Sequence, residues 1–147
     1  MSVASKPLMG GKVDFSTPQN LSTARTGVTT IASPSAGADL VLLGTAGTYG
    51  GYISSIKYQF RGTGTQAAAL IYIWRTDTSG ANAEIVDVFT VTAAAAAMSN
   101  TNNGQYEERT YNDFNLQSGQ KVYASVSVLT ASCTVNIIPN GGQFEGQ

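Results

Sequence analysis

Near the carboxyl end of the chain, apolar and polar side chains alternate with a period of two. In residues 122–128, Val and Ala alternate with Tyr and Ser, and after a turn at residues 130–132 a second alternating run begins at Cys133. Successive side chains of a β-strand point to opposite faces, so such a run presents one apolar face to a core. This periodicity constrains the fold more than any motif in the chain.

The same alternation recurs from residue 38 onward. Ile56, Tyr58 and Phe60 share one face of a predicted strand, and polar side chains occupy the other face. Further strands are predicted at residues 39–43, 69–75, 85–91 and 105–111. About seven or eight short strands separated by turn-forming residues predict an all-β chain. We expect an antiparallel β-sandwich, in the form of a single jelly roll of about eight strands.

Three of the segments allow more detailed predictions. Residues 69–75 (ALIYIWR) are apolar on both faces, which predicts a central or covered strand. The turn-forming residues 77–82 predict a hairpin to the next strand. Residues 93–97 are all alanine, the best helix former, but the run is too short for a stable isolated helix. A short helical turn and a thin strand both fit this run.

The amino-terminal part of the chain differs in composition. Residues 1–37 are rich in Ser, Thr, Pro and Gly, and Pro7, Pro18 and Pro34 are spread through them. Proline lacks the amide donor of a sheet ladder and favours extended backbone before it. We therefore divide the chain into an extended arm with short edge strands, residues 1–37, and a jelly-roll domain, residues 38–147. A disordered tail and an arm that orders on a neighbour both fit this composition.

Charge is scarce, at 12% of the residues, and the net charge is −1. Nucleic acids and anionic membranes attract clustered positive charge, and no basic block occurs, so neither is an expected partner. The chain has no apolar run of signal-peptide or membrane-helix length, and we expect synthesis in a host cytoplasm. Cys133 is the only cysteine, which excludes an intrachain disulfide and predicts a buried structural thiol.

The sequence contains no histidine, which removes the commonest general base and the commonest zinc ligand. An enzyme of this composition would depend on two carboxylates that converge in one cleft. Glu107 and Glu108 are neighbours on a predicted strand, so they point to opposite faces, and pairing with Arg109 and Arg75 is expected instead. We expect no catalytic residue, no metal site and no cofactor.

Asp87 is the acidic residue with the most unusual predicted position. Alternation places it on the apolar face of its strand, where burial would require a cationic partner, and Lys57, Arg61 and Arg75 are the candidates. A catalytic role for Asp87 stays open. The loop at residues 77–82 superficially resembles a calcium loop, but its oxygen ligands are too few and wrongly spaced.

Aromatic residues are the remaining candidates for a binding surface, because their flat apolar faces stack on sugar rings. Tyr49 and Tyr52 lie beside several glycines and are predicted to be exposed loop aromatics that bind a partner. Tyr72 and Trp74 share one face of the strand at residues 69–75, and core packing is favoured for both.

The assembled features resemble the small jelly-roll decoration, or cement, proteins of tailed bacteriophage capsids. The strand series from residue 53 to residue 138, the closing pattern LQSGQKVY at residues 116–123, and the charge-poor composition with an extended arm carry this resemblance. More loosely, the chain is similar to the jelly-roll heads of viral fibres and to the trimeric tumour-necrosis-factor-like fold. The resemblance is architectural and includes no signature motif, so it transfers no family residue.

The resemblance implies a non-catalytic structural protein of the virion. Such a protein would bind the major capsid protein and copies of itself, as a dimer or trimer, and would stabilise contacts between capsomers. Within the arm, the predicted contacts with the capsid or a neighbour are Lys6, Lys12, Asp14 and Phe15.

Two other functions stay open. A carbohydrate- or receptor-binding module of a phage tail or fibre predicts exposed aromatic side chains in a groove or at loop tips. A histidine-free enzyme predicts two carboxylates in a concave pocket, at least one of them with a raised pKa.

Overall fold

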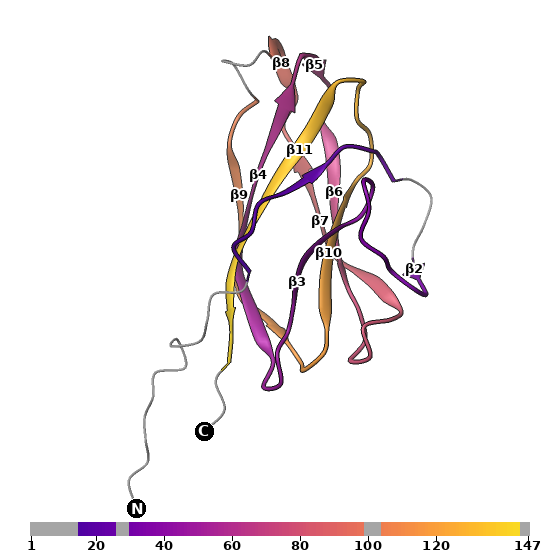
Figure 1. Cartoon of the computed structure of the whole chain (residues 1–147). Coiled ribbons are helices and arrows are strands. Elements are labelled where there is room, and N and C mark those ends of the chain that lie inside the picture. The colour runs from indigo at the N-terminus through magenta and orange to yellow at the C-terminus, as the bar shows by residue number, and fades with distance from the viewer. Residues whose placement is uncertain (1–14, 26–29, 99–103, 145–147) are drawn as a thin grey trace, which may run out of the picture.

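The computed structural model describes residues 15–25, 30–98 and 104–144. These residues form β-strands and loops and contain no helix, and therefore no helix that could cross a membrane (Figure 1). The strands are β1 (Gln19–Leu21), β2 (Thr30–Ile31), β3 (Val41–Thr45), β4 (Gly51–Gly62), β5 (Gly64–Gln66), β6 (Ala69–Arg75), β7 (Ala83–Val91), β8 (Ala94–Met98), β9 (Glu107–Leu116), β10 (Lys121–Val126) and β11 (Cys133–Gln143).

Two antiparallel sheets pack face to face and form a β-sandwich. One sheet has four strands in the order β1-β11-β4-β9, and the other has five in the order β2-β7-β6-β10-β3. The short strands β5 and β8 form a separate antiparallel ribbon. The prediction of an all-β, antiparallel sandwich is confirmed.

Four strand pairs are nested within one another along the chain. β6 pairs with β7, β4 with β9, β3 with β10, and β1 with β11, so each pair encloses the one before it. Successive pairs lie alternately in the five-stranded and the four-stranded sheet. The chain is therefore arranged as one long antiparallel ribbon that is folded over on itself.

Alternation predicted the core residues of β4 correctly. Ile56, Tyr58 and Phe60 of β4 are at most 6% exposed and lie between the sheets. In the five-stranded sheet, β6 is the middle strand and is apolar on both faces, as its sequence predicts. Its outward-facing Trp74 is buried in a second cluster with Tyr123, and the Trp74 indole Nε1 donates a 2.8 Å hydrogen bond to Ser125 Oγ.

Residues 15–25 belong to the sandwich and not to a separate arm. Phe15 has no exposed surface, forms a bridge with Gly141, and occupies with its ring the space that a side chain at Gly44 would need. Arg25 Nη1 donates to Asp39 Oδ2 at 2.6 Å and ties this segment to residues that precede β3. The chain thus joins the core well before residue 38.

These observations correct one part of the predicted contact. Phe15 is a core residue of its own chain and is not available to a neighbour. The short edge strands expected before residue 38 are β1 and β2, one on each sheet. The other predicted contact residues, Lys6, Lys12 and Asp14, lie outside the described residues.

Three local predictions can also be compared with the structure. The alanine run forms strand β8, with Ala94 opposite Gln66 of β5. β6 and β7 form the expected hairpin. Cys133 is 3% exposed, which confirms a buried thiol.

Candidate functional site

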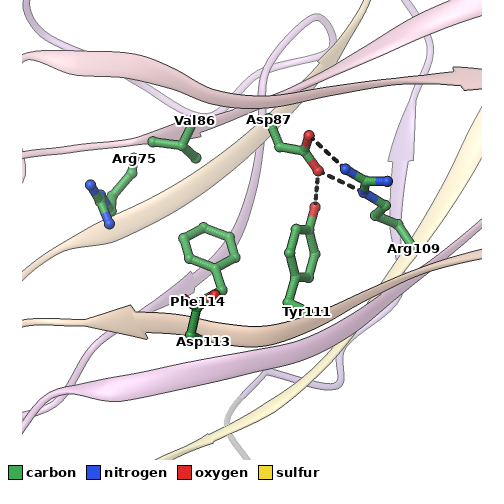
Figure 2. Close-up of a pocket in the computed structure, with 7 residues that line it drawn as sticks. All are labelled: Arg75, Val86, Asp87, Arg109, Tyr111, Asp113 and Phe114. Carbon is green, nitrogen blue, oxygen red and sulfur yellow. Dashed lines mark hydrogen bonds and ion pairs between the residues drawn. The ribbon is translucent and has the colours of Figure 1, made fainter.

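A hollow of about 450 Å³ opens at the side of the sandwich where β7 of one sheet faces β9 of the other. Residues of β6, β7 and β9 line it (Figure 2): Arg75, Val86, Asp87, Arg109, Tyr111, Asp113 and Phe114. In the view of Figure 2, Asp87, Arg109 and Tyr111 gather at one end, Arg75 lies at the other end, and the Phe114 ring lies between them.

Two β-bulges shape this hollow, one in each sheet. In β7, Val86 is an extra residue, because Asp87 pairs with Ile73 while Ile85 pairs with Trp74. In β9, residues 111–113 face a single residue of β4. A bulge redirects side chains away from simple alternation. Here the two bulges turn Val86 and residues of the 111–113 segment toward the same space.

Asp87 holds the two sheets together at one end of the hollow. Its Oδ2 accepts hydrogen bonds from Arg109 Nε at 2.9 Å and from the Tyr111 hydroxyl at 2.8 Å. Its Oδ1 accepts from Arg109 Nη2 at 3.1 Å and from the Val88 amide at 2.9 Å. The Asp87 side chain is 16% exposed, and four donors occupy both of its oxygens.

This bonding determines the protonation states of the cluster. Burial alone would raise the pKa of Asp87, but hydrogen bonds from Arg109 and Tyr111 and the Arg109 charge outweigh it and lower the pKa. Burial, together with the hydrogen bond to Asp87 and its negative charge, raises the pKa of Tyr111 well above the usual range. Asp87 is therefore a carboxylate and Tyr111 a neutral phenol across the physiological pH range.

Asp87 forms its ion pair with Arg109, so the predicted pairing with Lys57, Arg61 or Arg75 is wrong. The Arg109 guanidinium also lies over the rings of Phe89 and Tyr111, at 6.0 Å and 5.9 Å from their centroids. Such contacts add a cation–π attraction to the ion pair.

Among the residues that the structure describes, Glu107 and Glu108 do not form the predicted pairs with arginines. Glu107 accepts hydrogen bonds from the amide and the hydroxyl of Thr92, at 2.8 Å and 2.6 Å. Glu108 lies opposite Lys57 of β4 in the strand register. Glu107 thus fixes the end of β7 to β9.

The aromatic candidates lie outside the hollow. Tyr49 is 63% exposed in the turn that precedes β4, as its prediction requires. Tyr52 is a strand residue of β4, half-buried against Phe144, with 5.7 Å between the ring centroids. The structure therefore does not place the two tyrosines together as a pair of loop aromatics.

The loop between β6 and β7 supplies the hydrogen-bond donors for its own acidic residue, Asp77. Asp77 accepts hydrogen bonds from the Ser79 amide and hydroxyl, the Ala81 amide and the Asn82 side chain. These bonds, led by those of Ser79 and Asn82, lower the pKa of Asp77 to about 2. The carboxylate is thus used to close the loop.

In the described parts of the chain, no group of three or more His, Cys, Asp or Glu residues is placed to hold a metal ion. Two carboxylates, Asp87 and Asp113, do line the hollow. However, Asp87 has a lowered pKa and four hydrogen-bond donors, which suits neither a general acid nor an efficient general base. The described geometry thus gives Asp87 a structural role.

No family model, no curated protein and no solved structure matches this chain.

Proposed function

We propose that the nested ribbon of eight strands is a jelly roll. Its strands would be β1, β3, β4, β6, β7, β9, β10 and β11. A jelly roll has eight strands in two sheets with Greek-key connections. The nested pairing, with the first strand of the series beside the last and successive pairs in alternate sheets, supports this assignment. In this interpretation β2, β5 and β8 are additions to the basic fold.

We further propose that the protein is a non-catalytic structural component of a virion. It would bind the outer capsid shell and copies of itself, and would strengthen contacts between capsomers. A fold does not define a function, so the proposal depends on a surface.

The outward face of the five-stranded sheet is the observation that carries this proposal. The outward side chains of β6 are Leu70, Tyr72 and Trp74, and Val88 of β7 lies directly opposite Tyr72. Leu70 is 38% exposed and Val88 is 42% exposed, while Tyr72 is half-buried between them in the strand register. These neighbouring apolar side chains on one sheet face are the surface through which we propose association.

A second copy of the chain is the partner that best fits this face. Apolar side chains of one copy can cover the same side chains of another across a two-fold axis. The net charge of −1 also gives little repulsion between copies. The outward positions of β6 are also uncharged from Leu70 to Trp74.

Light scattering tests the association. The full chain is expected to form a dimer through this face, and Val88→Lys or Leu70→Lys is expected to give monomers. Val128→Lys is the matched control, because Val128 is 45% exposed but follows the end of β10. A full chain that stays monomeric at high concentration, or variants that associate like the control, would contradict self-association.

A test of the role of the amino-terminal residues requires a truncation that leaves the core intact. Removal of residues 1–37 would delete β1, β2 and Phe15, so a loss of association would report unfolding. A truncation after residue 14 leaves these elements intact. If the truncated chain binds undecorated shells of the encoding phage as well as the full chain does, the first 14 residues are not the contact.

Shell binding tests the virion role itself. Sedimentation with undecorated shells is expected to retain the full chain, and decorated shells are expected to resist heat better than bare ones. Shells that neither bind the protein nor gain stability would overturn the proposal.

A further inference from the structure

We propose that the hollow between β7 and β9 binds a pyranose unit of a neutral glycan. The ligand would contact Arg75, Asp113 and Phe114, while the Asp87 cluster supports the site without touching the sugar. This inference does not depend on self-association or on shell binding.

The site is built into both sheets. The bulge at Val86 and the bulge at residues 111–113 face each other across the hollow. Bulges are common beside functional sites, where they redirect side chains. Two bulges at one place create a concavity where regular strands would continue the sandwich.

At the Asp87 end of the hollow, the polar side chains form hydrogen bonds with one another. Asp87 is saturated by four donors, which fixes Arg109 and the Tyr111 ring. Tyr111 in turn packs edge-on against Phe114, with 5.1 Å between the ring centroids. The cluster therefore holds the Phe114 ring in place before any ligand arrives, which lowers the entropic cost of binding.

Arg75 and Asp113 are polar groups available to a ligand. Both line the hollow, and within the described residues neither side chain forms an ion pair or a side-chain hydrogen bond. Asp113 can accept hydrogen bonds from two hydroxyl groups, and the Arg75 guanidinium can donate to hydroxyl oxygens. Phe114 offers an apolar ring to the C–H face of a sugar.

Charge and size point to a neutral ligand. Two guanidinium groups, of Arg75 and Arg109, balance the carboxylates of Asp87 and Asp113, so the lining has no net charge. An anionic ligand would meet the Asp113 carboxylate, and a cationic one would meet Arg75. The volume of about 450 Å³ lies in the range of small-molecule sites.

A glycan array of neutral and acidic glycans, followed by calorimetric titration with the best neutral disaccharide, tests this site on the full chain. We expect neutral glycans to bind. Asp113→Asn and Arg75→Gln are each expected to weaken binding about tenfold, because each removes charge-assisted hydrogen bonds.

Glu108→Gln and Lys57→Gln are matched controls that remove the same charges from exposed positions of β9 and β4. They are expected to leave the affinity unchanged. Thermal unfolding of each variant separates loss of the site from loss of the fold. An array without neutral ligands, binding of acidic glycans alone, or affinity that survives both hollow variants would overturn the proposal.

Discussion

Two aspartates ten residues apart, Asp77 and Asp87, show two ways to satisfy a carboxylate. Each accepts four hydrogen bonds, and each has a pKa below the usual value. The donors to Asp77 lie within five residues of it, in its own loop. The side-chain donors to Asp87 lie 22 and 24 residues away, on the other sheet.

The hydrogen bonds of Asp77 stabilise local structure, whereas those of Asp87 stabilise tertiary structure. Asp77 closes a hairpin loop, so its bonds form whenever the hairpin forms. Asp87 joins the edges of two sheets, so its bonds form only when the sandwich has assembled. Loss of Asp87 should therefore affect global stability, whereas loss of Asp77 should affect mainly one loop.

Asp87→Ala is expected to cause the largest effect. The substitution leaves the Arg109 guanidinium and the half-buried Tyr111 hydroxyl without their acceptor, at a cost of about 2 kcal/mol. Partial exposure of Arg109 keeps the cost below that of a fully buried pair. Urea unfolding measures the change, and a loss no larger than that of Asp77→Ala would contradict the comparison.

Tyr111→Phe is expected to cost about 1 kcal/mol, because it removes one hydrogen bond and keeps the ring. A double-mutant cycle with Asp87→Asn should give a coupling energy between the two positions. Additive effects would show that the hydroxyl and the carboxylate do not act together.

Alkaline pH provides a separate test of the same hydroxyl. The pKa of Tyr111 in the folded protein is raised above its usual 10.0, so its contribution to stability is complete below that pH and is lost as the pH rises further. The stability difference between the natural protein and Tyr111→Phe should therefore shrink above pH 10.0. Urea unfolding of both proteins at several pH values above 10.0 measures this difference in stability. A difference that does not change with pH would refute the raised pKa of Tyr111.

Asp77→Asn is expected to cause the smallest loss of stability, which is present at neutral pH and shrinks in acid. The folded-state pKa of about 2 lies below the usual 3.8, so the Asp77 contribution is present above pH 3.8 and is lost as the pH falls toward 2. The variant should show a weaker dependence of stability on pH in this window. Chemical denaturation at several acidic pH values measures it, and an unchanged pH dependence would argue against the loop bonds.

The sequence predicted the features that depend on neighbouring residues. Alternation identified the strands and inner faces of β4, β10 and β11, and the turn-forming residues identified the hairpin at Asp77. Each of these depends on backbone geometry and burial within one short segment.

The partners across the molecule were not predictable in the same way. Nothing near Asp87 in the sequence indicates Arg109, and the bulge at residues 111–113 breaks the alternation that would place Tyr111 and Phe114. The Ser-, Thr-, Pro- and Gly-rich composition of residues 1–37 predicts an arm that includes Phe15, although its ring fills the space beside Gly44. The signal in the sequence was the concentration of aromatic and charged residues in β9, a strand with little apolar alternation.

The pairing of β1 with β11 determines when the chain can complete its fold. More than a hundred residues separate Asn20 from its partner Asn136, so the amino-terminal strand must wait until synthesis has reached the far end of the chain. Until then β4 lacks its neighbour β11, and Phe15 lacks the backbone of Gly141 that it bridges. Closure of such distant pairs is slow, and the waiting strands expose edges that other chains can join. We therefore expect the chain to depend on chaperones during synthesis until β11 has formed and paired with β1.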